Sequence, residues 1–338
     1  MRIAVIGAGA VGGTLAALLD RAGHDVAVTA RGAHAAAMRA DGLRLTGAWG
    51  DHIARVEVSA AVDQTPDLVI VATKATDAID AVAASAARID GVPVVVAQNG
   101  LESVRSLATV VPRSDLVGAL ALFAASHLEP GAVAVTAPGS LSIGDESSTH
   151  IASHFAARVL DPVIPTTIVD DFRGAQWTKL LINQVNALPA ITGSSVQDTI
   201  RHRALRRVLV ASMRETVAVA RAAGIRFTPM SGLTPLAISV FAALPAALSG
   251  FLPLAMAKRM GDVPNPGSTL QSISRGHLSE IDYLNGAVVS EARAARVDAP
   301  VNTVLLDLVH SVERTGRFLD PSAVVAAVQQ VSAKTRRG

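Results

Sequence analysis

Short apolar runs separated by helix-like stretches fill the first half of the chain. The first run, Ile3–Ile6, is rich in β-branched residues, and a helical pattern over Val11–Gly23 follows it. A second strand is expected within Gly23–Arg31. Further runs lie at 67–72, 92–97, 116–122, 131–136 and 141–143. Their continuous apolar character predicts strands covered on both faces, as in a doubly wound, mainly parallel α/β sheet.

The second half of the chain changes to a helical pattern. Residues 161–171 contain two prolines and are interpreted as a final strand or a linker. The helices expected after them span 177–188, 200–223, 276–296, 301–314 and 321–333. At 338 residues, the chain is long enough for two separate cores. We therefore expect a Rossmann-type α/β domain over 1–168 and an all-α domain over 169–338.

One stretch of the second half, residues 227–257, carries no charge. Its length qualifies it as a candidate membrane span, but Pro235, Pro245 and Pro253 divide it into short pieces. Short buried or interface helices are the favoured interpretation, and a membrane span or a mobile apolar lid are the alternatives. Association through this surface into a homodimer is a hypothesis.

A glycine motif of the form G-x-G-x-x-G directly follows the first expected strand. Its six positions are Gly7, Ala8, Gly9, Ala10, Val11 and Gly12. The first glycine permits a tight turn, the second lets the main chain approach a pyrophosphate, and the third lets helix and strand pack closely. The helix N–H groups and dipole then face the phosphates. The motif predicts a dinucleotide site, with a purely structural turn as the alternative.

The end of the second expected strand bears on which dinucleotide binds. NAD enzymes place an acidic residue there, about 20 positions beyond the glycine loop, to bind the ribose hydroxyls. This chain has Arg31 instead, whose guanidinium can bind a 2′-phosphate that a carboxylate would repel. NADP(H) is therefore favoured over NAD(H), and a solvated residue at the start of a loop is the alternative.

Three polar residues recur in the expected helix 177–188. Lys179, Asn183 and Asn186 fall at i, i+4 and i+7, so they share one helix face, and apolar residues occupy the others. In a buried helix the residues of such a stripe would line a cleft or satisfy one another, and partial desolvation would lower the pKa of the lysine and suit it to proton transfer. A solvent face of an ordinary amphipathic helix is the other interpretation.

Two further segments are candidates. Glu280 and Asp282 lie early in the expected helix 276–296, where they can also simply complement the helix dipole. Asn99 directly follows the expected strand 92–97, at the strand end where ligands bind in doubly wound sheets, although Asn-Gly is also a common turn dipeptide.

Composition narrows the function classes. The formal charge of +2 does not imply a nucleic-acid or membrane partner, and the absence of cysteine excludes disulfides, thiolate metal sites and cysteine nucleophiles. His150 and His154 share a helix face but lack a third ligand, so no metal site is expected. This composition fits a cytoplasmic enzyme.

Taken together, these motifs resemble the ketopantoate reductase (2-dehydropantoate 2-reductase) family over nearly the whole chain. The matching features are Gly7–Gly12, Arg31, Thr73-Lys74-Ala75, Asn99-Gly100, Trp177-x-Lys179-Leu180, Asn183, Ser268 and Glu280–Gly286. The resemblance implies hydride transfer from NADPH to the C2 ketone of ketopantoate, which forms pantoate and serves pantothenate biosynthesis.

The resemblance also implies roles for individual residues. Lys179 would be the general acid that protonates the developing alkoxide, and Glu280 would bind the cofactor ribose or the substrate and hold Lys179 in position. Asn99 would contact the cofactor beside the substrate. Arg31 and Lys74 would bind the phosphate on the adenosine side. Substrate-binding candidates are Asn183, Asn186, Ser268 and Asn99.

The chain departs from the family pattern at its expected pocket. Ser268 is followed by Thr269-Leu270-Gln271-Ser272 rather than by Met and an acidic residue, and Ala187 stands where some members carry a second Asn. The ketone substrate is therefore less defined than the reaction. A related NADP-dependent hydroxy-acid or imine dehydrogenase and a non-catalytic NADP-binding sensor are the alternatives.

Overall fold

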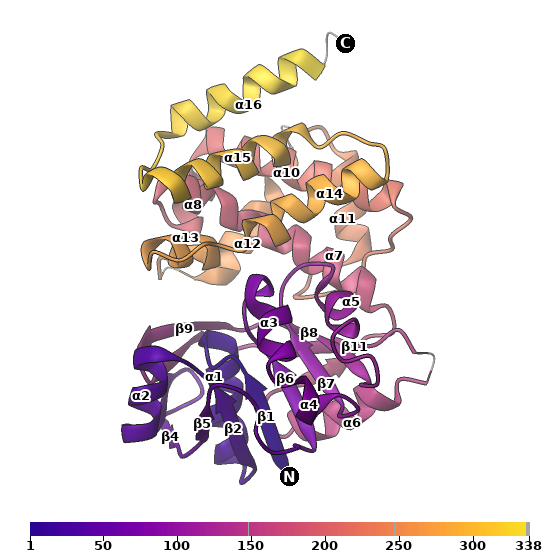
Figure 1. The fold of residues 1–338 in the computed structure, drawn as a ribbon. Coiled ribbons are helices and arrows are strands. Elements are labelled where there is room, and N and C mark those ends of the chain that lie inside the picture. Colours follow the sequence, from indigo (N-terminus) through magenta and orange to yellow (C-terminus); the bar gives the residue numbers. More distant parts are fainter. Residues whose placement is uncertain (148, 247, 262, 336–338) are drawn as a thin grey trace. The chain divides into compact units, whose positions relative to one another are not determined.

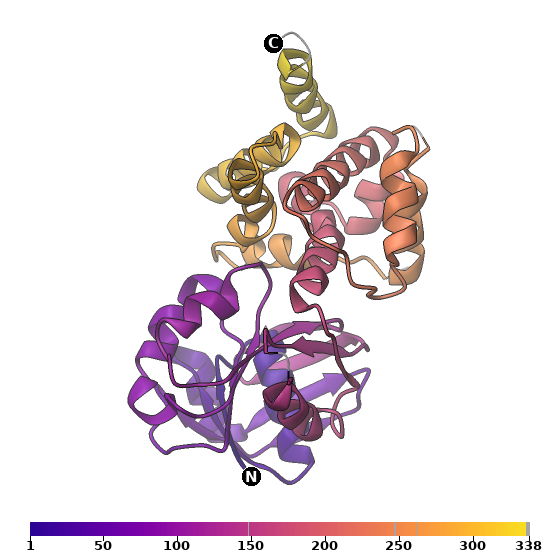
Figure 2. The same ribbon diagram turned by 90° about the vertical axis from the view of Figure 1, so that its right-hand side faces the viewer.

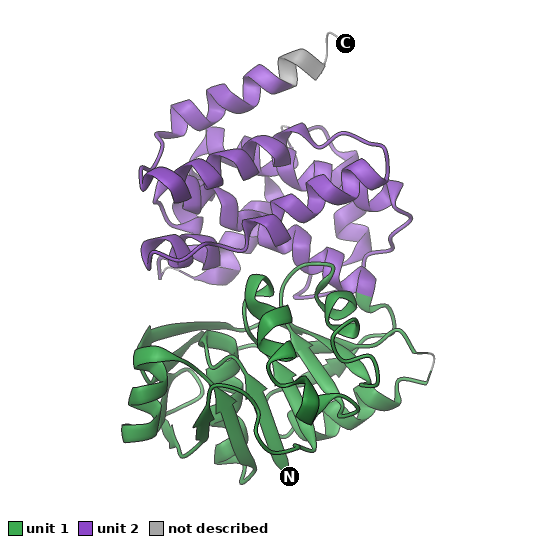
Figure 3. Cartoon of the chain, in the orientation of Figure 1, with its two compact units in different colours: residues 1–172 green, residues 173–338 purple. Residues whose placement is uncertain are grey.

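The computed structural model describes residues 1–147, 149–246, 248–261 and 263–335. The chain divides into two compact units, Met1–Phe172 and Arg173–Gly338, and Figure 3 colours them separately. Each unit has its own buried apolar core.

An eight-stranded sheet forms the centre of the first unit (Figure 1). Its strand order is β12 (Thr166–Ile168), β11 (Leu141–Gly144), β8 (Leu116–Ala121), β7 (Val94–Ala97), β6 (Leu68–Val71), β1 (Arg2–Ile6), β2 (Asp25–Thr29) and β5 (Glu57–Ser59). Neighbours are parallel except β11, which runs antiparallel to β8. The chain reverses its direction across the sheet between β1 and β6. Ligands bind at such a switch point in doubly wound sheets.

Helices cover both faces of this sheet. Successive strand residues point to opposite faces, and because both sets are apolar here, each face must be buried. Ile3 and Val5 of β1 belong to a core shared with α1 (Ala10–Arg21) and α6 (Ile151–Leu160). The alternate residues Ala4 and Ile6 belong to a second core. That core is shared with α3 (Ala78–Ala83), α4 (Ala86–Ile89) and α5 (Ser103–Ala108), and Figure 2 shows the helices on the two sides. The predicted doubly wound α/β sheet is confirmed.

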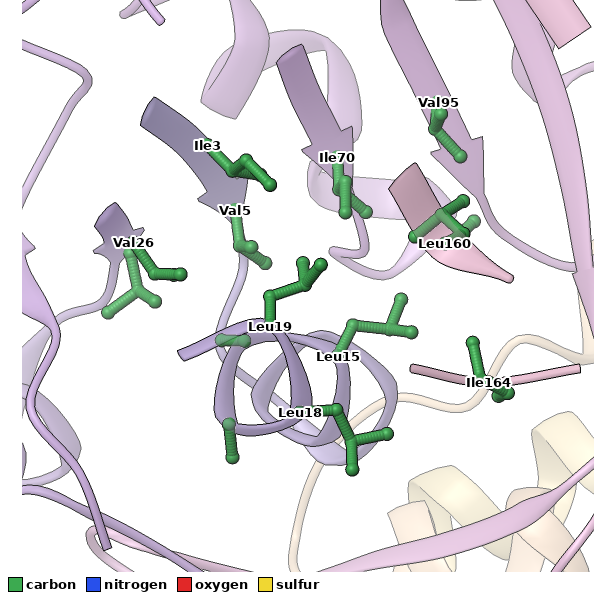
Figure 4. Close-up of a cluster of buried hydrophobic side chains, with 14 of the residues drawn as sticks. Ile3, Val5, Leu15, Leu18, Leu19, Val26, Ile70, Val95, Leu160 and Ile164 are labelled. Carbon is green, nitrogen blue, oxygen red and sulfur yellow. The ribbon is translucent and has the colours of Figure 1, made fainter. Parts of the chain in front are cut away.

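A second sheet, which the sequence pattern did not predict, packs on α1. Its order is β4 (His52–Ala54), β3 (Leu43–Gly47), β10 (Ala132–Ala137) and β9 (Ala124–Glu129). The expected strand 131–136 belongs to this sheet rather than to the large one. Leu15 and Leu19 of α1 point toward the strands that carry Val5 and Ile70 (Figure 4). Val133 of β10 lies in the same core, so α1 packs between two sheets. The remaining helix of this unit is α2 (Gly32–Asp41).

The second unit is built of helices, as expected. These are α7 (Phe172–Asn183, whose first residue closes the first unit), η2 (Gln184–Asn186), α8 (Ala187–Thr192), α9 (Val196–Arg201), α10 (Arg203–Ala222), α11 (Pro235–Ala243), α12 (Phe251–Met260), α13 (Gly267–Ser274), η3 (Ile281–Tyr283), α14 (Asn285–Ala294), α15 (Pro300–Thr315) and α16 (Pro321–Thr335). Buried residues of α8, α10, α15 and α16 share one core.

Three of the expected helices are interrupted. The helix expected over 177–188 ends at Asn183 and continues through the 3₁₀ turn η2 into α8. The one expected over 200–223 breaks at His202, whose Nδ1 accepts the Leu205 N–H at 3.3 Å and caps α10. The α-helix expected over 276–296 begins only at Asn285. Glu280 and Asp282 precede it, in and beside the 3₁₀ turn η3, so the prediction that they lie early in this α-helix is wrong. These breaks depend on side-chain caps and tertiary contacts, which the hydrophobic period does not record.

The uncharged stretch 227–257 forms short helices, as predicted. Thr234 caps α11 by accepting the Ala237 N–H at 3.2 Å, and Pro235 occupies the first turn. Among the described residues, we find no helix with the length and apolar character needed to cross a membrane.

Candidate active site

Four predicted site segments of the first unit lie at one edge of the large sheet. The glycine motif follows β1, Arg31 follows β2, Lys74 follows β6 and Asn99 follows β7. These four strands are adjacent and parallel, so their carboxyl ends open on the same edge. The fold therefore gathers these four segments at the switch point.

The three glycines of the motif have different surroundings. Gly7 has a φ of +96°, and a Cβ there would lie 2.6 Å from Thr73 Cγ2. A Cβ on Gly12 would lie 1.9 Å from the Gly7 carbonyl oxygen, so only glycine permits this approach of α1 to the turn. A Cβ on Gly9, the N-cap of α1, would meet nothing within 4 Å. The space above Gly9, at a helix N-terminus, fits the approach of a pyrophosphate.

Side-chain hydrogen bonds tie the strand ends around this turn. The Gly7 N–H donates to Thr29 Oγ1 at 3.0 Å, so the last residue of β2 holds the glycine loop. Gln98 Nε2 donates to the Thr73 carbonyl at 2.8 Å and so ties the end of β7 to the end of β6. Gln98 is buried, and its Oε1 has no hydrogen-bond partner among the described residues.

A hollow of about 300 Å³ lies beside the glycine turn. It is lined by Gly7, Ala8, Thr29, Ala30, Arg31, His34, Ala60, Thr73, Asp77, Asp80 and Ala81. Arg31 is exposed and is the cation among these lining residues. Lys74 is half-buried and directly follows Thr73. This hollow is a candidate site for the adenosine end of a dinucleotide.

His34 supports the glycine turn from α2 and was not predicted. Its Nδ1 accepts the Gly131 N–H at 2.8 Å, which leaves Nε2 to donate to the Ala8 carbonyl at 2.8 Å. Thr29, Thr73 and Gln98 were also missed as supports of this turn. Their common signal in the sequence is that each lies at or just beyond the end of a strand.

Lys179 projects from α7 and is half-buried. Burial lowers the pKa of its amine from the usual 10.5 to about 8. Asn183, one turn further on, is 9% exposed, and Asn186 is 8% exposed. The alternative that these three residues form a solvent-facing stripe is therefore wrong.

Asn186 was expected on the same helix as Lys179, but it lies in the 3₁₀ turn η2, after α7 has ended. Its Nδ2 donates to the Asn183 carbonyl at 3.1 Å, and its Oδ1 accepts the Ser268 N–H at 3.1 Å. A Cβ on Gly267 would lie 2.6 Å from the same oxygen. The Asn186 amide thus seats the start of α13 against the end of α7. Three of the expected substrate-binding residues, Asn183, Asn186 and Ser268, are brought together in this way, and the Ser268 side chain is exposed.

Glu280 immediately precedes η3 and is half-buried. Its carbonyl accepts the Tyr283 N–H at 2.9 Å, and the neighbouring Ser279 hydroxyl accepts the Ile281 N–H at 3.2 Å. Asp282, two residues on, lies within 3.2 Å of His310 on α15 and is engaged at the surface. Among the described residues, no group of three or more His, Cys, Asp or Glu side chains could hold a metal ion.

Comparison with known proteins relates this arrangement to one family. The sequence profile "Ketopantoate reductase PanE/ApbA" matches residues 3–148, and its C-terminal counterpart matches residues 171–313. The chain belongs to the ketopantoate reductase family. It is an oxidoreductase of the 2-dehydropantoate 2-reductase type, and the predicted family and enzyme class are confirmed.

Relatives in sequence and solved structures are similar to this protein over nearly the whole chain. The 2-dehydropantoate 2-reductase of Halobacterium salinarum is 29% identical and covers 94% of this chain and 100% of its own. The crystal structure of a PanE/ApbA family ketopantoate reductase from Ralstonia eutropha is 32% identical in sequence and has a TM-score of 0.80. The match covers 93% of this chain and 99% of that one. A D-mandelate dehydrogenase solved with NADH and anilino(oxo)acetate has the same TM-score of 0.80 at 20% identity, covers 93% and 99% of the two chains, and shares the fold.

The glycine geometry predicts that two matched substitutions differ strongly in their effect on stability. Gly12→Ala should lower the free energy of unfolding by about 1–3 kcal/mol, because its Cβ overlaps a main-chain oxygen. Gly9→Ala should change it by less than about 0.5 kcal/mol, because its Cβ has room. Thermal denaturation of both variants checks this, and equal melting temperatures would contradict the close approach of α1 to the turn.

Proposed function

We propose that this protein reduces a 2-ketoacid with NADPH, and that the ketoacid is 2-dehydropantoate, giving pantoate. The observation that carries the proposal is the half-buried Lys179, whose pKa of about 8 lies close to neutral pH. Ordinary lysines hold their protons too tightly for transfer at that pH. The family relationship supports the choice of a ketone as the group that receives the proton.

The proposed chemistry needs one acid and one hydride donor. A bound nicotinamide cofactor supplies the hydride to C2 of the ketoacid. The Lys179 ammonium stabilises the negative charge that develops on the carbonyl oxygen and then donates its proton to that oxygen. The neutral amine regains a proton from solvent. In this proposal Glu280 holds Lys179 in position and binds the cofactor ribose or the substrate.

Substrate recognition is assigned to the segment around α13. Asn183 and Ser268 would bind the carboxylate or hydroxyl of the ketoacid, and Asn99 would contact the cofactor beside it. Asn186 was expected to bind substrate, but its side-chain nitrogen and oxygen both form hydrogen bonds with main-chain groups. We therefore assign it the role of holding Ser268 in position.

The cofactor is assigned to the glycine turn and the adjoining hollow. Gly7–Gly12 would hold the pyrophosphate at the N-terminus of α1, and Arg31 with Lys74 would bind the 2′-phosphate of NADP(H). The end of β2 supports NADP(H) over NAD(H). Its last residue is Thr29, whose hydroxyl accepts the Gly7 N–H, and not the carboxylate that would bind the ribose hydroxyls of NAD(H). A cytoplasmic location for the enzyme stays a prediction.

A related hydroxy-acid dehydrogenase is the second candidate function. Two observations support this candidate: the fold is shared with a D-mandelate dehydrogenase, and the residues after Ser268 depart from the family pattern. A panel of 2-ketoacids offered with NADPH distinguishes the two, because 2-dehydropantoate should have the highest kcat/KM. Cofactor binding without reduction of any ketoacid would instead favour a non-catalytic NADP sensor.

Lys179 should control both the rate and its pH dependence. Lys179→Ala should lower kcat by about 100-fold or more, as removal of a general acid does. Because the acid must be protonated, wild-type kcat should be full below pH 8 and fall as the pH rises through about 8. NADPH oxidation with 2-dehydropantoate measures both effects. Arg221→Ala, at an exposed cation of α10, is the control, and an unchanged rate in Lys179→Ala would remove its catalytic role.

Arg31 should distinguish the two cofactors. Arg31→Ala should weaken NADPH binding about 10- to 100-fold, the typical worth of a charged hydrogen bond, and leave NADH binding nearly unchanged. Arg39→Ala, within helix α2, whose N-cap is Arg31, lies outside the hollow, makes the same change in charge and should affect neither. Fluorescence titration of both cofactors gives the dissociation constants, and equal losses for NADPH and NADH would refute the phosphate contact.

We also propose that the enzyme is a homodimer that associates through α11 and α12. These helices expose large apolar side chains, among them Leu236 at 73% and Leu254 at 44%, in the uncharged stretch 227–257. Light scattering after size-exclusion chromatography should give twice the chain mass of 34.7 kDa. Leu236→Glu should shift the enzyme toward monomer, and a monomeric wild type would reject the proposal.

A further inference from the structure

Four fully buried polar side chains meet in the helical unit. They are Gln184 of η2, Ser212 of α10, Asn285 of α14 and Asn302 of α15. Nothing in the proposed chemistry uses them. Polar groups are costly in an apolar core unless their hydrogen bonds are made, so their arrangement requires an explanation.

The hydrogen bonds determine the orientation of each amide. Gln184 Nε2 donates to the Leu180 carbonyl at 3.3 Å, so its Oε1 faces the cluster. Asn302 Nδ2 donates to the Ser212 carbonyl at 3.1 Å and to Glu215 at 2.8 Å, so its Oδ1 also faces the cluster. Two acceptor oxygens therefore point at the same place, and both require donors.

Asn285 supplies both donors. Its Nδ2 donates to Gln184 Oε1 at 2.9 Å and to Asn302 Oδ1 at 3.0 Å, one N–H for each acceptor. The Ser212 hydroxyl lies 2.8 Å and 3.0 Å from the same two oxygens, but it has one proton to share between them. Asn285 Oδ1 has no partner among the described residues. The Asn285 amide thus joins the Gln184 and Asn302 side chains through its nitrogen, while its own oxygen accepts no hydrogen bond from a described residue.

One of these two bonds, Asn285–Gln184, connects the segments that carry the proposed catalytic residues, and the other, Asn285–Asn302, leads to α15. Gln184 directly follows α7, which carries Lys179 and Asn183. Asn285 lies five residues after Glu280, at the first residue of α14. The far end of the cluster is anchored by Glu215, whose carboxylate accepts the N–H groups of Val301 and Asn302 at 2.8 Å and 2.9 Å and so holds the start of α15.

We propose that Asn285 is a positioning residue of the reaction, which holds the end of α7 and the Glu280 segment in one arrangement through Gln184. This inference rests on the proposed function of Lys179 and Glu280. The break of α7 at η2 leaves its last turn without a continuing α-helix, and the Asn285–Gln184 bond restrains that turn in its place. A small displacement of a catalytic group is enough to slow the reaction strongly.

The test compares three variants in the full-length enzyme with 2-dehydropantoate and NADPH. Asn285→Ala should lower kcat by about 10- to 100-fold. It should also raise the pH at which kcat falls to half, because a loosened α7 end leaves Lys179 better solvated. Ser212→Ala removes the shared proton but keeps both Asn285 bonds, so its kcat and pH profile should match the wild type. Val324→Ala, a fully buried apolar truncation on α16, controls for loss of stability alone.

The outcomes separate this inference from the proposed function. If the wild type reduces no 2-ketoacid, the proposed function fails and the positioning role fails with it. If the wild type is active and Asn285→Ala behaves like Ser212→Ala in both kcat and pH profile, the cluster is purely structural and the inference alone is overturned. Should Asn285→Ala not fold, Asn285→Ser keeps one donor, and its kcat and pH profile should then be altered in the same direction by a smaller amount.

Discussion

The main chain at the turn between β1 and α1 approaches itself so closely that no side-chain carbon fits between Gly12 and the Gly7 carbonyl. The rest of the first unit depends on this contact. It sets α1 against the large sheet and, on its other side, against β10. The same turn leaves the space above Gly9 open, and the ends of β2 and β6 contact it through Thr29 and Thr73. A packing constraint and a binding cradle are therefore one structure.

The helical unit depends instead on satisfied polar groups within an apolar core. An amine that is half-buried on α7 holds its proton less tightly, which is the property a general acid needs near neutral pH. Such a group is useful only if its helix is held in place. Buried amides from η2, α14 and α15 do this by bonding one another. Further hydrogen bonds fix the orientations of Gln184 and Asn302, and the two acceptor oxygens that these amides present fix the orientation of Asn285.

Local patterns in the sequence were sufficient for the larger part of the fold. The glycine spacing after Ile3–Ile6 identified the β1–α1 turn, and continuous apolar runs identified β6, β7 and β8, because strands covered on both faces must be apolar throughout. The small second sheet was missed because β9 is largely half-exposed and has no such run. The α-helix expected around Glu280 was wrong, because the Ser279 hydroxyl accepts the Ile281 N–H and a 3₁₀ turn follows, which ends at Leu284 with a non-helical φ of −108° and ψ of −94°.

The sequence by itself determined which residues could do chemistry: the glycine motif, Arg31 at a strand end, and the polar stripe that begins at Lys179. These depend on spacing, and spacing is a property of the chain alone. Only the tertiary structure decided that Asn186 seats Ser268, that His34 supports the glycine turn, and that Asn285 bridges Gln184 and Asn302. Each of these contacts joins residues far apart in the chain. A hydrogen bond depends on distance and direction in space, which no local period encodes.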